Sequence, residues 1–372
     1  MRFVQVKDLR EGMRIAKPIY NQKGVLLFGR GVALRNSAIV NIESLNLFGL
    51  YILEPTEPLP PITEEEEEFE RFQAASSFAL ADGLADVLNG DLPRKIETLA
   101  ADIQKRYGNL NRKINFMQSI RNPNDHVYRH SVNVAILTAL ISHKLKISRN
   151  DQLYLIVSAL LHDIGKLMCP DELLNKTGKL TYDELTTIRQ FELDGYNLIR
   201  NNYMLPSGIR RFFIQMSTEL LSKMEQAEND NDSKILLGTK IIKIADLFDI
   251  LTAMRVYKDP MSEFAAVTYM LEREYEFDEN VVEAIISSIN ILPVGACVDL
   301  TNGEKALIIK ENEATPLRPT VLSLGKNQVY DLGLRSTYET VKISDIIKTM
   351  DNRFVMSPEL VDKFYASNAT IK

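Results

Sequence analysis

The residues of this sequence that could bind a metal ion or transfer protons fall into three stretches. His126 and His130 are spaced as i and i+4, His162 and Asp163 are adjacent, and Asp246 follows much later in the chain. Residues spaced in this way lie on the same face of an α-helix, so both imidazoles of the first stretch would point in one direction. Either pair alone is more often structural than metal-binding. Together with a distant carboxylate, however, they form a candidate ligand set for a divalent metal.

The segments around these residues have the pattern of buried helices. The apolar run at 153–161 predicts a helix with Asn150 or Asp151 as its N-cap. The histidine–aspartate pair would then lie at the last turn of this helix, and Gly165 could end it in a left-handed conformation. An imidazole, a carboxylate and the ammonium of Lys166 would emerge together from a core element.

Asp246 lies in a strongly apolar segment that predicts a long helix over 233–257. A carboxylate in such a helix needs a partner, because an unpaired buried charge is costly. A metal ion would supply that partner. Lys243, on the same helix, is the competing explanation.

Composition limits the class of protein. The chain has 372 residues, of which 45% are hydrophobic and 25% charged, as is typical of a globular protein with two or three domains. A net charge of −6 gives no electrostatic footprint for nucleic acid, although a local positive site could still hold a small anion. Cys169 and Cys297 are the only cysteines, which favours a reducing compartment, and Cys169 is interpreted as a packing residue. Without a signal peptide or a membrane-spanning run, we expect a cytoplasmic protein with no membrane partner.

The hydrophobic period changes twice along the chain, at a proline cluster near residue 58 and again near Leu292. Short alternating runs come first, helical spacing follows, and hairpin signals such as Thr301-Asn302-Gly303 appear last. These changes predict a mainly α fold, in which an all-helical bundle is flanked by a small N-terminal α+β module and a C-terminal β-rich segment. The expected parts are the module at 1–58, a linker with leading helices at 59–122, the helical domain at 123–291, the β-rich segment at 292–345 and a tail at 346–372.

The order of a histidine, a histidine–aspartate pair and a distant aspartate, each on a helix, resembles the HD superfamily of metal-dependent phosphohydrolases. His162-Asp163-Ile164-Gly165-Lys166 matches the central motif of that family. Several further segments are similar to the HD-GYP subfamily: 174–181 after the central motif, 246–252 with Arg255 and Tyr257 in a late helix, and 293–295 with 318–319 in a β-rich tail. The resemblance covers most of the chain.

HD-GYP proteins hydrolyse cyclic di-GMP with two or three iron or manganese ions, so the resemblance implies roles for particular residues. Four residues match metal ligands of the family: His130, His162, Asp163 and Asp246. Lys166 matches the lysine that holds the phosphate, and with Asp163 it would take part in catalysis. His126 falls where three-metal members have a glutamate, which makes it a candidate extra ligand.

The chain departs from the family pattern where the second metal ion would be held. Phe191 stands in place of the next histidine ligand, and a phenyl ring cannot bind a metal. The region 204–235 holds neither the adjacent histidine pair nor the Gly-Tyr-Pro signature; in a loose alignment, Phe212 and Phe213 occupy the positions of the pair. No histidine follows His162 anywhere in the sequence. The sequence therefore predicts one divalent ion, iron, manganese or a similar metal.

Three functions remain open from the sequence. The first is a degenerate HD-GYP-type protein of bacterial cyclic-dinucleotide signalling, which binds a metal and a nucleotide or partner protein with weak or no hydrolysis. The second is an active HD-type phosphohydrolase or phosphodiesterase with a single ion. The third is a structural helical module without metal. The expected ligand is a cyclic dinucleotide or another phosphate-containing small molecule, and a signalling protein partner and a homodimer stay open.

Overall fold

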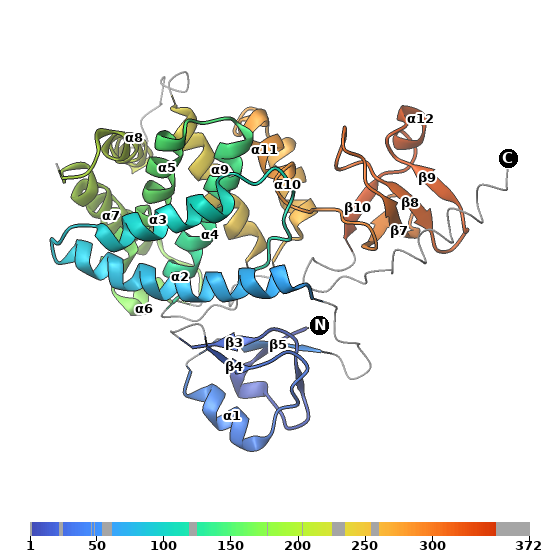
Figure 1. Ribbon diagram of the computed structural model, residues 1–372, viewed down its shortest axis with the longest axis horizontal. Helices are drawn as coiled ribbons and strands as arrows, with labels where there is room; N and C mark the ends of the chain where they lie inside the picture. Colours follow the sequence, from blue (N-terminus) through green and yellow to red (C-terminus); the bar gives the residue numbers. More distant parts are fainter. Residues whose placement is uncertain are drawn as a thin grey trace.

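The computed structural model of the protein describes residues 2–21, 25–45, 47, 49–53, 62–118, 125–176, 178–202, 204–224, 235–253 and 260–346. Helices form the middle of the chain, and small sheets form its two ends (Figure 1). The expected fold class is therefore confirmed. The limits given above for the individual domains stay predictions, and the tail from residue 347 onward lies outside the described residues.

The N-terminal module is a small antiparallel sheet with one helix. β1, β5 and β2 form a sheet in that order, and β3 pairs with β4 in a second. The run 14–20 is divided into two short strands with Pro18 between them, whose nitrogen cannot donate a hydrogen bond. The elements are β1 (Arg2–Gln5), the 3-10 helix η1 (Val6–Asp8), β2 (Arg14–Ile15), β3 (Ile19–Tyr20), β4 (Leu26–Phe28), α1 (Asn36–Glu43) and β5 (Gly49–Leu53).

The helical domain is built around α4, which packs against α2, α3, α5, α9 and α11. The domain's elements are α2 (Glu64–Leu88), α3 (Arg94–Tyr107), α4 (His126–Lys144), α5 (Arg149–Leu161), the 3-10 helix η2 (Ile164–Met168), α6 (Asp171–Leu174), α7 (Tyr182–Arg200), α8 (Ser207–Met224), α9 (Leu237–Thr252), α10 (Glu263–Leu271) and α11 (Glu279–Ile286). No helix within the described ranges has the length and apolar character needed to cross a lipid bilayer.

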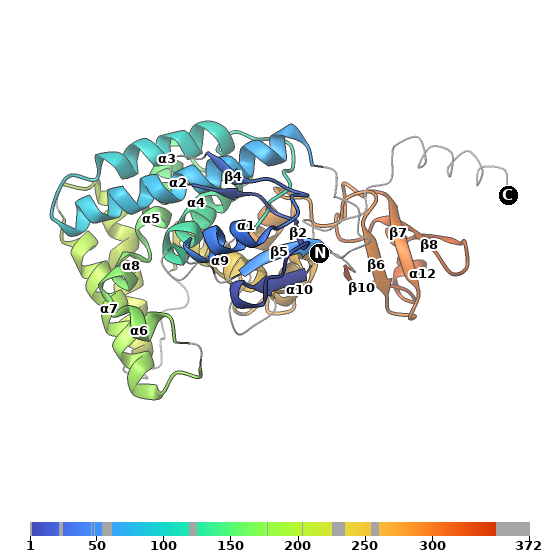
Figure 2. The same ribbon diagram turned by 90° about the horizontal axis from the view of Figure 1, so that it is seen from below.

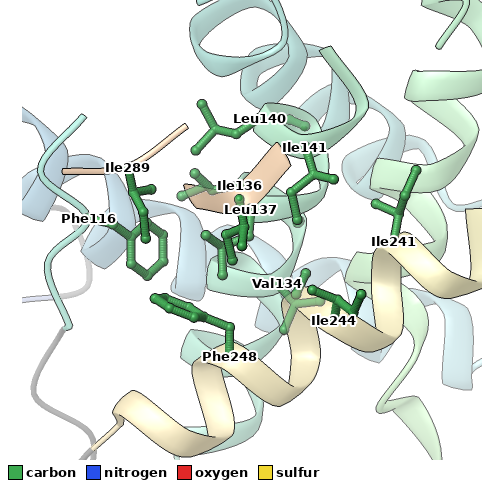
Figure 3. Close-up of a cluster of buried hydrophobic side chains, with 14 of the residues drawn as sticks. Phe116, Val134, Ile136, Leu137, Leu140, Ile141, Ile241, Ile244, Phe248 and Ile289 are labelled. Carbon is green, nitrogen blue, oxygen red and sulfur yellow. The ribbon is translucent and has the colours of Figure 1, made fainter. Parts of the chain in front are cut away.

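The core beside α4 is aliphatic and aromatic. Nearly every residue of α4 from Val132 to Ser142 is buried, so this helix has no solvent-exposed face over that span. Figure 3 shows how side chains of α4 meet those of α9 and of the segments that follow α3 and α11; the residues it labels are Phe116, Val134, Ile136, Leu137, Leu140, Ile141, Ile241, Ile244, Phe248 and Ile289. Polar groups on α4 and α9 are therefore held in fixed relative positions by this packing.

The N-caps of three helices show how the local sequence sets where a helix begins. Thr63 and Thr181 each form a capping box with the glutamate three residues later. Four consecutive glutamates, Glu64 to Glu67, lie in the first turn of α2, where the helix dipole favours negative charge. The N-cap of α5, however, is Ser148, whose hydroxyl accepts a hydrogen bond from the backbone N–H of Asp151 at 3.2 Å. The expectation of Asn150 or Asp151 as that cap was wrong.

The C-terminal segment is a five-stranded antiparallel sheet in the order β10-β6-β7-β8-β9. The expected turn between β6 and β7 is present, with Gly303 at a φ of +81°. Buried residues such as Val298 and Ile308 belong to the same hydrophobic core as the helices, so the sheet packs onto the helical domain. Its elements are β6 (Cys297–Leu300), β7 (Lys305–Lys310), β8 (Thr320–Ser323), β9 (Val329–Asp331), α12 (Arg335–Tyr338) and β10 (Ile343–Ile346).

The N-terminal module is joined to the helical domain by two buried cations. The guanidinium of Arg30 lies 2.6 Å from the carboxylate of Glu70 on α2, and both side chains are 8% exposed. The ammonium of Lys17 donates a hydrogen bond to the backbone carbonyl of Gln118, which precedes α4. A pocket of about 400 Å³ lies at this junction, lined by both parts of the chain. Figure 2 shows the module against the helical domain in a second view.

Candidate metal centre

The first ligand candidate, His130, lies one turn into α4 and is buried. Its Nδ1 lies 2.6 Å from Oδ2 of Asp249 on α9, a hydrogen bond in which the ring donates to the carboxylate. With the Nδ1 proton used in this way, the other ring nitrogen points into the site. There, Nε2 lies 3.0 Å from Oδ1 of Asp246. Asp246 and Asp249, one turn apart on α9, thus contact the two ring nitrogens of one imidazole.

The second candidate, His162, follows the last residue of α5 directly. Its Nδ1 lies 2.7 Å from the carbonyl oxygen of Ala159, which can only accept, so Nδ1 must carry the proton. The lone pair of Nε2 is then directed toward the same point as that of His130. Oδ1 of Asp163 lies 3.5 Å from this Nε2. The expectation that the histidine–aspartate pair leaves the end of a buried helix is confirmed.

Gly165 does not end α5 in a left-handed conformation, so that expectation was wrong. The chain continues as η2, and the need for glycine comes from a neighbouring helix. A Cβ at Gly165 would lie 2.2 Å from the carbonyl oxygen of Phe191 on α7. A Cβ at Gly195, one turn further along α7, would lie 2.5 Å from the backbone nitrogen of Gly165. The two backbones therefore approach each other closely, with glycine on each side.

Asp246 on α9 completes the cluster. Its Oδ1 lies 3.0 Å from Nε2 of His130 and 3.8 Å from Nε2 of His162. The ligand atoms of these three residues all lie within 4.8 Å of one another. The competing partner, Lys243, forms an ion pair with Glu219 of α8 instead. The carboxylate in this apolar helix is thus explained by the two imidazoles and not by the lysine.

Asp163 and Lys166 lie beside this cluster. Oδ2 of Asp163 is 3.6 Å from Nε2 of His130 and 2.7 Å from the ammonium of Lys166. His126, at the first position of α4, is half-buried and is not part of the three-residue group. The roles of Asp163, Lys166 and His126 as ligand, catalytic group and extra ligand stay predictions.

Two buried nitrogen atoms show that the cluster fits a cation. Nε2 of His130 and Nε2 of His162 each lack a hydrogen-bond partner within the described part of the chain. The contact of 3.0 Å between the first of them and Asp246 does not have the alignment of a hydrogen bond. A buried polar atom without a partner is costly, and a divalent ion between two imidazole nitrogens and a carboxylate oxygen would satisfy all three atoms.

The charges of the cluster also favour binding of a cation. Burial lowers the pKa of His130, but the carboxylates of Asp246, Asp249 and Asp163 outweigh it and raise that pKa to about 9. Burial raises the pKa of Asp163, but Lys166 and the two imidazoles outweigh it and lower that pKa to about 2. The pKa of Asp246 is held well below its usual value, against the effect of burial, by its close contact with the same imidazoles. The three carboxylates thus outnumber the cations of His130 and Lys166, and a metal must displace a proton from His130.

A second layer of polar residues holds the ligands, and the sequence reading gave it no role. Asp249 is fully buried, and its Oδ1 accepts hydrogen bonds from Asn133 at 2.8 Å and from Gln118 at 3.1 Å. Asn133 lies on α4, among apolar residues, and Asp249 lies one turn after Asp246. These positions were the available signal, because a buried carboxylate or amide in an apolar helix needs a polar partner.

Beside α7, at the expected place of a second ion, several of the described side chains are aromatic. Phe191 is half-buried on this helix. Phe212 and Phe213 on α8 are buried in the core, and the ring of the latter lies 5.9 Å from that of Tyr196 on α7. Their assignment to the family's histidine positions stays a prediction. Glu192 faces the charges of Lys166 and Asp163, and its pKa is raised, mainly by burial; the sequence reading did not single it out.

Two residues of the late-helix resemblance, Arg255 and Tyr257, lie outside the described residues, as do residues 225–234. Figure 2 shows α7 and α8 at the end of the helical domain opposite the C-terminal sheet. The three-residue cluster instead joins α4, α5 and α9, in the middle of the bundle.

Comparison with known proteins agrees with this geometry. A family model of the HD domain matches residues 115–281. Cyclic di-GMP phosphodiesterase PA4108 of Pseudomonas aeruginosa is 26% identical over 208 residues, which are 54% of this chain and 49% of that protein. Cyclic di-GMP phosphodiesterase PdeB of Borreliella burgdorferi is 25% identical over 57% of this chain and 56% of its own length. The 3'3'-cGAMP-specific phosphodiesterase 3 of Vibrio cholerae is 32% identical over 44% of this chain and 35% of its own length.

The chain spans about half the length of the first two of these relatives. The match to the HD domain covers α4, α5, α7 and α9, and so includes every residue of the cluster. The sequence motif, the fold and the paired imidazoles point to one assignment. Residues 115–281 thus match the HD domain family, and the relatives support an HD-GYP-like member of the HD superfamily.

Proposed function

We propose that this chain is a cytoplasmic protein of bacterial cyclic-dinucleotide signalling that binds one divalent ion, iron or manganese, and hydrolyses cyclic di-GMP weakly or not at all. The observation that carries the proposal is the pair of buried, partnerless Nε2 atoms of His130 and His162, which face Asp246. The names of the relatives, which are cyclic di-GMP and cGAMP phosphodiesterases, support a cyclic dinucleotide as the ligand.

His130, His162 and Asp246 would hold the ion, with Asp163 as the fourth ligand. A divalent ion supplies Lewis acidity, which stabilises charge on phosphate oxygens and makes water more acidic. Lys166 contributes a half-buried cation beside Asp163. Burial lowers the pKa of this lysine, but Asp163 and Glu192 outweigh that effect and raise it, so the ammonium stays charged and can hold a phosphate.

The proposal of a single ion rests on the small number of histidines in the sequence. The whole sequence contains four histidines, and His143 lies on the surface, 2.9 Å from the side-chain oxygen of Asn111. Only His126 is left to serve a second ion, whereas Phe191 occupies the place of the family's next ligand. A second ion clamps both reacting oxygens in a phosphoryl displacement, so its loss removes a large part of the stabilisation of the transition state.

The test is elemental analysis of protein purified without chelators, followed by assay of cyclic di-GMP and 3'3'-cGAMP with added manganese or iron under reducing, anaerobic conditions. We expect about one equivalent of metal and little or no product. Two or three equivalents would show that other residues replace the missing ligands. Turnover on the order of one per second or faster would contradict the degenerate assignment.

A second candidate function is an active phosphohydrolase or phosphodiesterase with a single ion. It is favoured by the retention of Lys166 and Asp163 next to the three-residue cluster, with their ion pair at 2.7 Å. The same assay, extended to nucleoside monophosphates, distinguishes the two. Protein that takes up no metal would instead support a structural helical module, and sedimentation of the loaded protein would decide between monomer and homodimer.

A further inference from the structure

We propose that Lys17 of the N-terminal module is a positioning residue for the metal ligand His130, so that the module is part of the support of the metal centre. This inference rests on the proposed function, namely that His130 binds a metal ion. It is drawn from a continuous series of buried hydrogen bonds that begins in the module and ends on the imidazole.

The first link crosses between the two parts of the chain. Lys17 lies between β2 and β3 and is only 2% exposed, which is rare for a lysine. Its ammonium donates to the backbone carbonyl of Gln118 and stands 4.7 Å from the centre of the Tyr51 ring. A buried ammonium must keep its acceptors, because losing one is costly. The position of the Gln118 peptide is therefore tied to the position of the module.

The second link runs through the Gln118 side chain. Its Nε2 donates to Oδ1 of Asp249 at 3.1 Å and to the hydroxyl of Thr252 at 2.9 Å. Its Oε1 accepts from Asn133 at 3.2 Å. Both ends of the amide are thus bonded, and the side chain is 6% exposed. With so many fixed partners, a shift of the Gln118 backbone must change the bonds to α9.

The third link reaches the ligand. Oδ2 of Asp249 accepts from Nδ1 of His130 at 2.6 Å. A carboxylate in this position fixes the orientation of a metal-binding imidazole and raises its basicity, and substitution of such a partner typically weakens metal binding by about 10- to 100-fold. Hydrogen bonds in a buried network also strengthen one another. Lys17 thus acts on the metal through Gln118, Asp249 and His130 without touching it.

The simpler alternative is that Lys17 only fastens the module to the helical domain. The chain offers a matched control for this role. Arg30 is also a buried cation of the module, and it also bonds the helical domain, at 2.6 Å from Glu70. Its hydrogen bonds go to Glu70 and to the carbonyl of Ala16, and none goes to Gln118. Removing Arg30 takes away one bond between the module and the helical domain but leaves the bond from Lys17 to Gln118 in place.

The experiment measures the affinity of the full chain for Mn²⁺ by competition with a chelator, at one pH, for wild type, Lys17→Met, Lys17→Arg, Arg30→Met and Asp249→Asn. We expect Lys17→Met to weaken binding by roughly tenfold and Asp249→Asn by as much or more. Lys17→Arg, which keeps a cation, should recover part of the loss, and Arg30→Met should stay within about twofold of wild type.

The double variant Lys17→Met/Asp249→Asn tests whether the two residues act through one route. If they do, it should bind Mn²⁺ no more than about twofold more weakly than Asp249→Asn alone, because effects within one network do not add. Effects that add fully would overturn the inference.

Two further results would also overturn it: wild-type affinity in Lys17→Met, or an equal loss in Arg30→Met. If Lys17→Met does not fold, Lys17→Gln takes its place under the same criteria. A wild-type chain that takes up no Mn²⁺ would overturn the proposed function itself, so failure of the function and failure of this inference are told apart.

Discussion

Two regions of the helical domain differ in the kinds of side chain that they bring together. Where α4, α5 and α9 meet, imidazoles and carboxylates are buried together and supported by a further layer of amides and a carboxylate. Along α7 and α8, by contrast, Phe191 is half-buried and the buried rings of Phe212 and Phe213 lie 5.1 Å apart. The difference supports the proposal that the first region binds a metal ion and that the second does not complete a two-metal site.

The largest expected effect concerns hydrolysis. We expect turnover of cyclic di-GMP to be at least about a thousandfold below that of ordinary enzymes, because the second source of charge stabilisation is missing. Restoring Phe191→His alone should not recover activity, since the histidine pair is also absent from the sequence. Product formation under anaerobic conditions is the measurement. Recovery by this one substitution would show that the α7 region is closer to function than its phenylalanines indicate.

The next effect concerns the metal itself. His162→Ala should weaken Mn²⁺ binding by on the order of a hundredfold or more, because a ligand contributes at least as much as its supporting partner. Phe191→Leu, in the other region, should leave Mn²⁺ affinity unchanged. Elemental analysis and chelator competition provide the readout. Equal losses in both variants would contradict the division of the domain into two functionally distinct regions.

A smaller effect is expected where the two regions touch. Gly195→Ala would place a Cβ 2.5 Å from the backbone of Gly165, so α7 and the motif turn must move apart. Overpacking of this kind typically costs about 1–3 kcal/mol of folding free energy. Gly178→Ala is the control, because nothing lies within 4 Å of its Cβ position. Denaturant unfolding measures both variants; unchanged stability of Gly195→Ala would mean that the crossing is more tolerant than the geometry indicates.

The pH dependence of Mn²⁺ binding tests the protonation of His130 in the metal region. His130 has a pKa of about 9 in the metal-free fold against an ordinary value of 6.5. Its protonation therefore stabilises the metal-free protein fully below about pH 6.5, and this contribution is lost as the pH rises through about 9. Metal binding displaces the same proton, so Mn²⁺ affinity should rise by about tenfold per pH unit between about pH 6 and 8. Titrations at several pH values test this, and a flat profile would mean that His130 is already neutral.

The sequence predicted the fold class and the three residues of the cluster, because these depend on hydrophobic period and on a motif with fixed spacing. It did not predict the roles of Gln118, Asn133 and Asp249. The apolar helices around Asn133 and Asp249 show that both need a polar partner but not which one, and nothing local to Gln118 shows that it supports a ligand. The N-cap of α5 was misassigned because Ser148 competes with two equally good neighbours.

Contacts between distant segments were the hardest to predict. Lysine is ordinarily a surface residue, and Lys17 is buried only because the module docks onto the helical domain. Gly165 was assigned to a helix end, whereas its partner lies on α7. In both cases the deciding neighbour is far away in the sequence, and the period of hydrophobic residues carries no information about it.

The contact between Gly165 and Gly195 has a consequence for how such a chain changes over generations. A mutation that replaces an imidazole by a phenyl ring alters one side chain and leaves the backbone in place. Replacing either glycine by a larger residue forces both backbones apart, so the same close contact requires glycine at both positions. Side chains of α7 can thus change while the crossing of α7 over the motif turn persists. Such a scaffold can gain or lose metal ligands through side-chain changes alone.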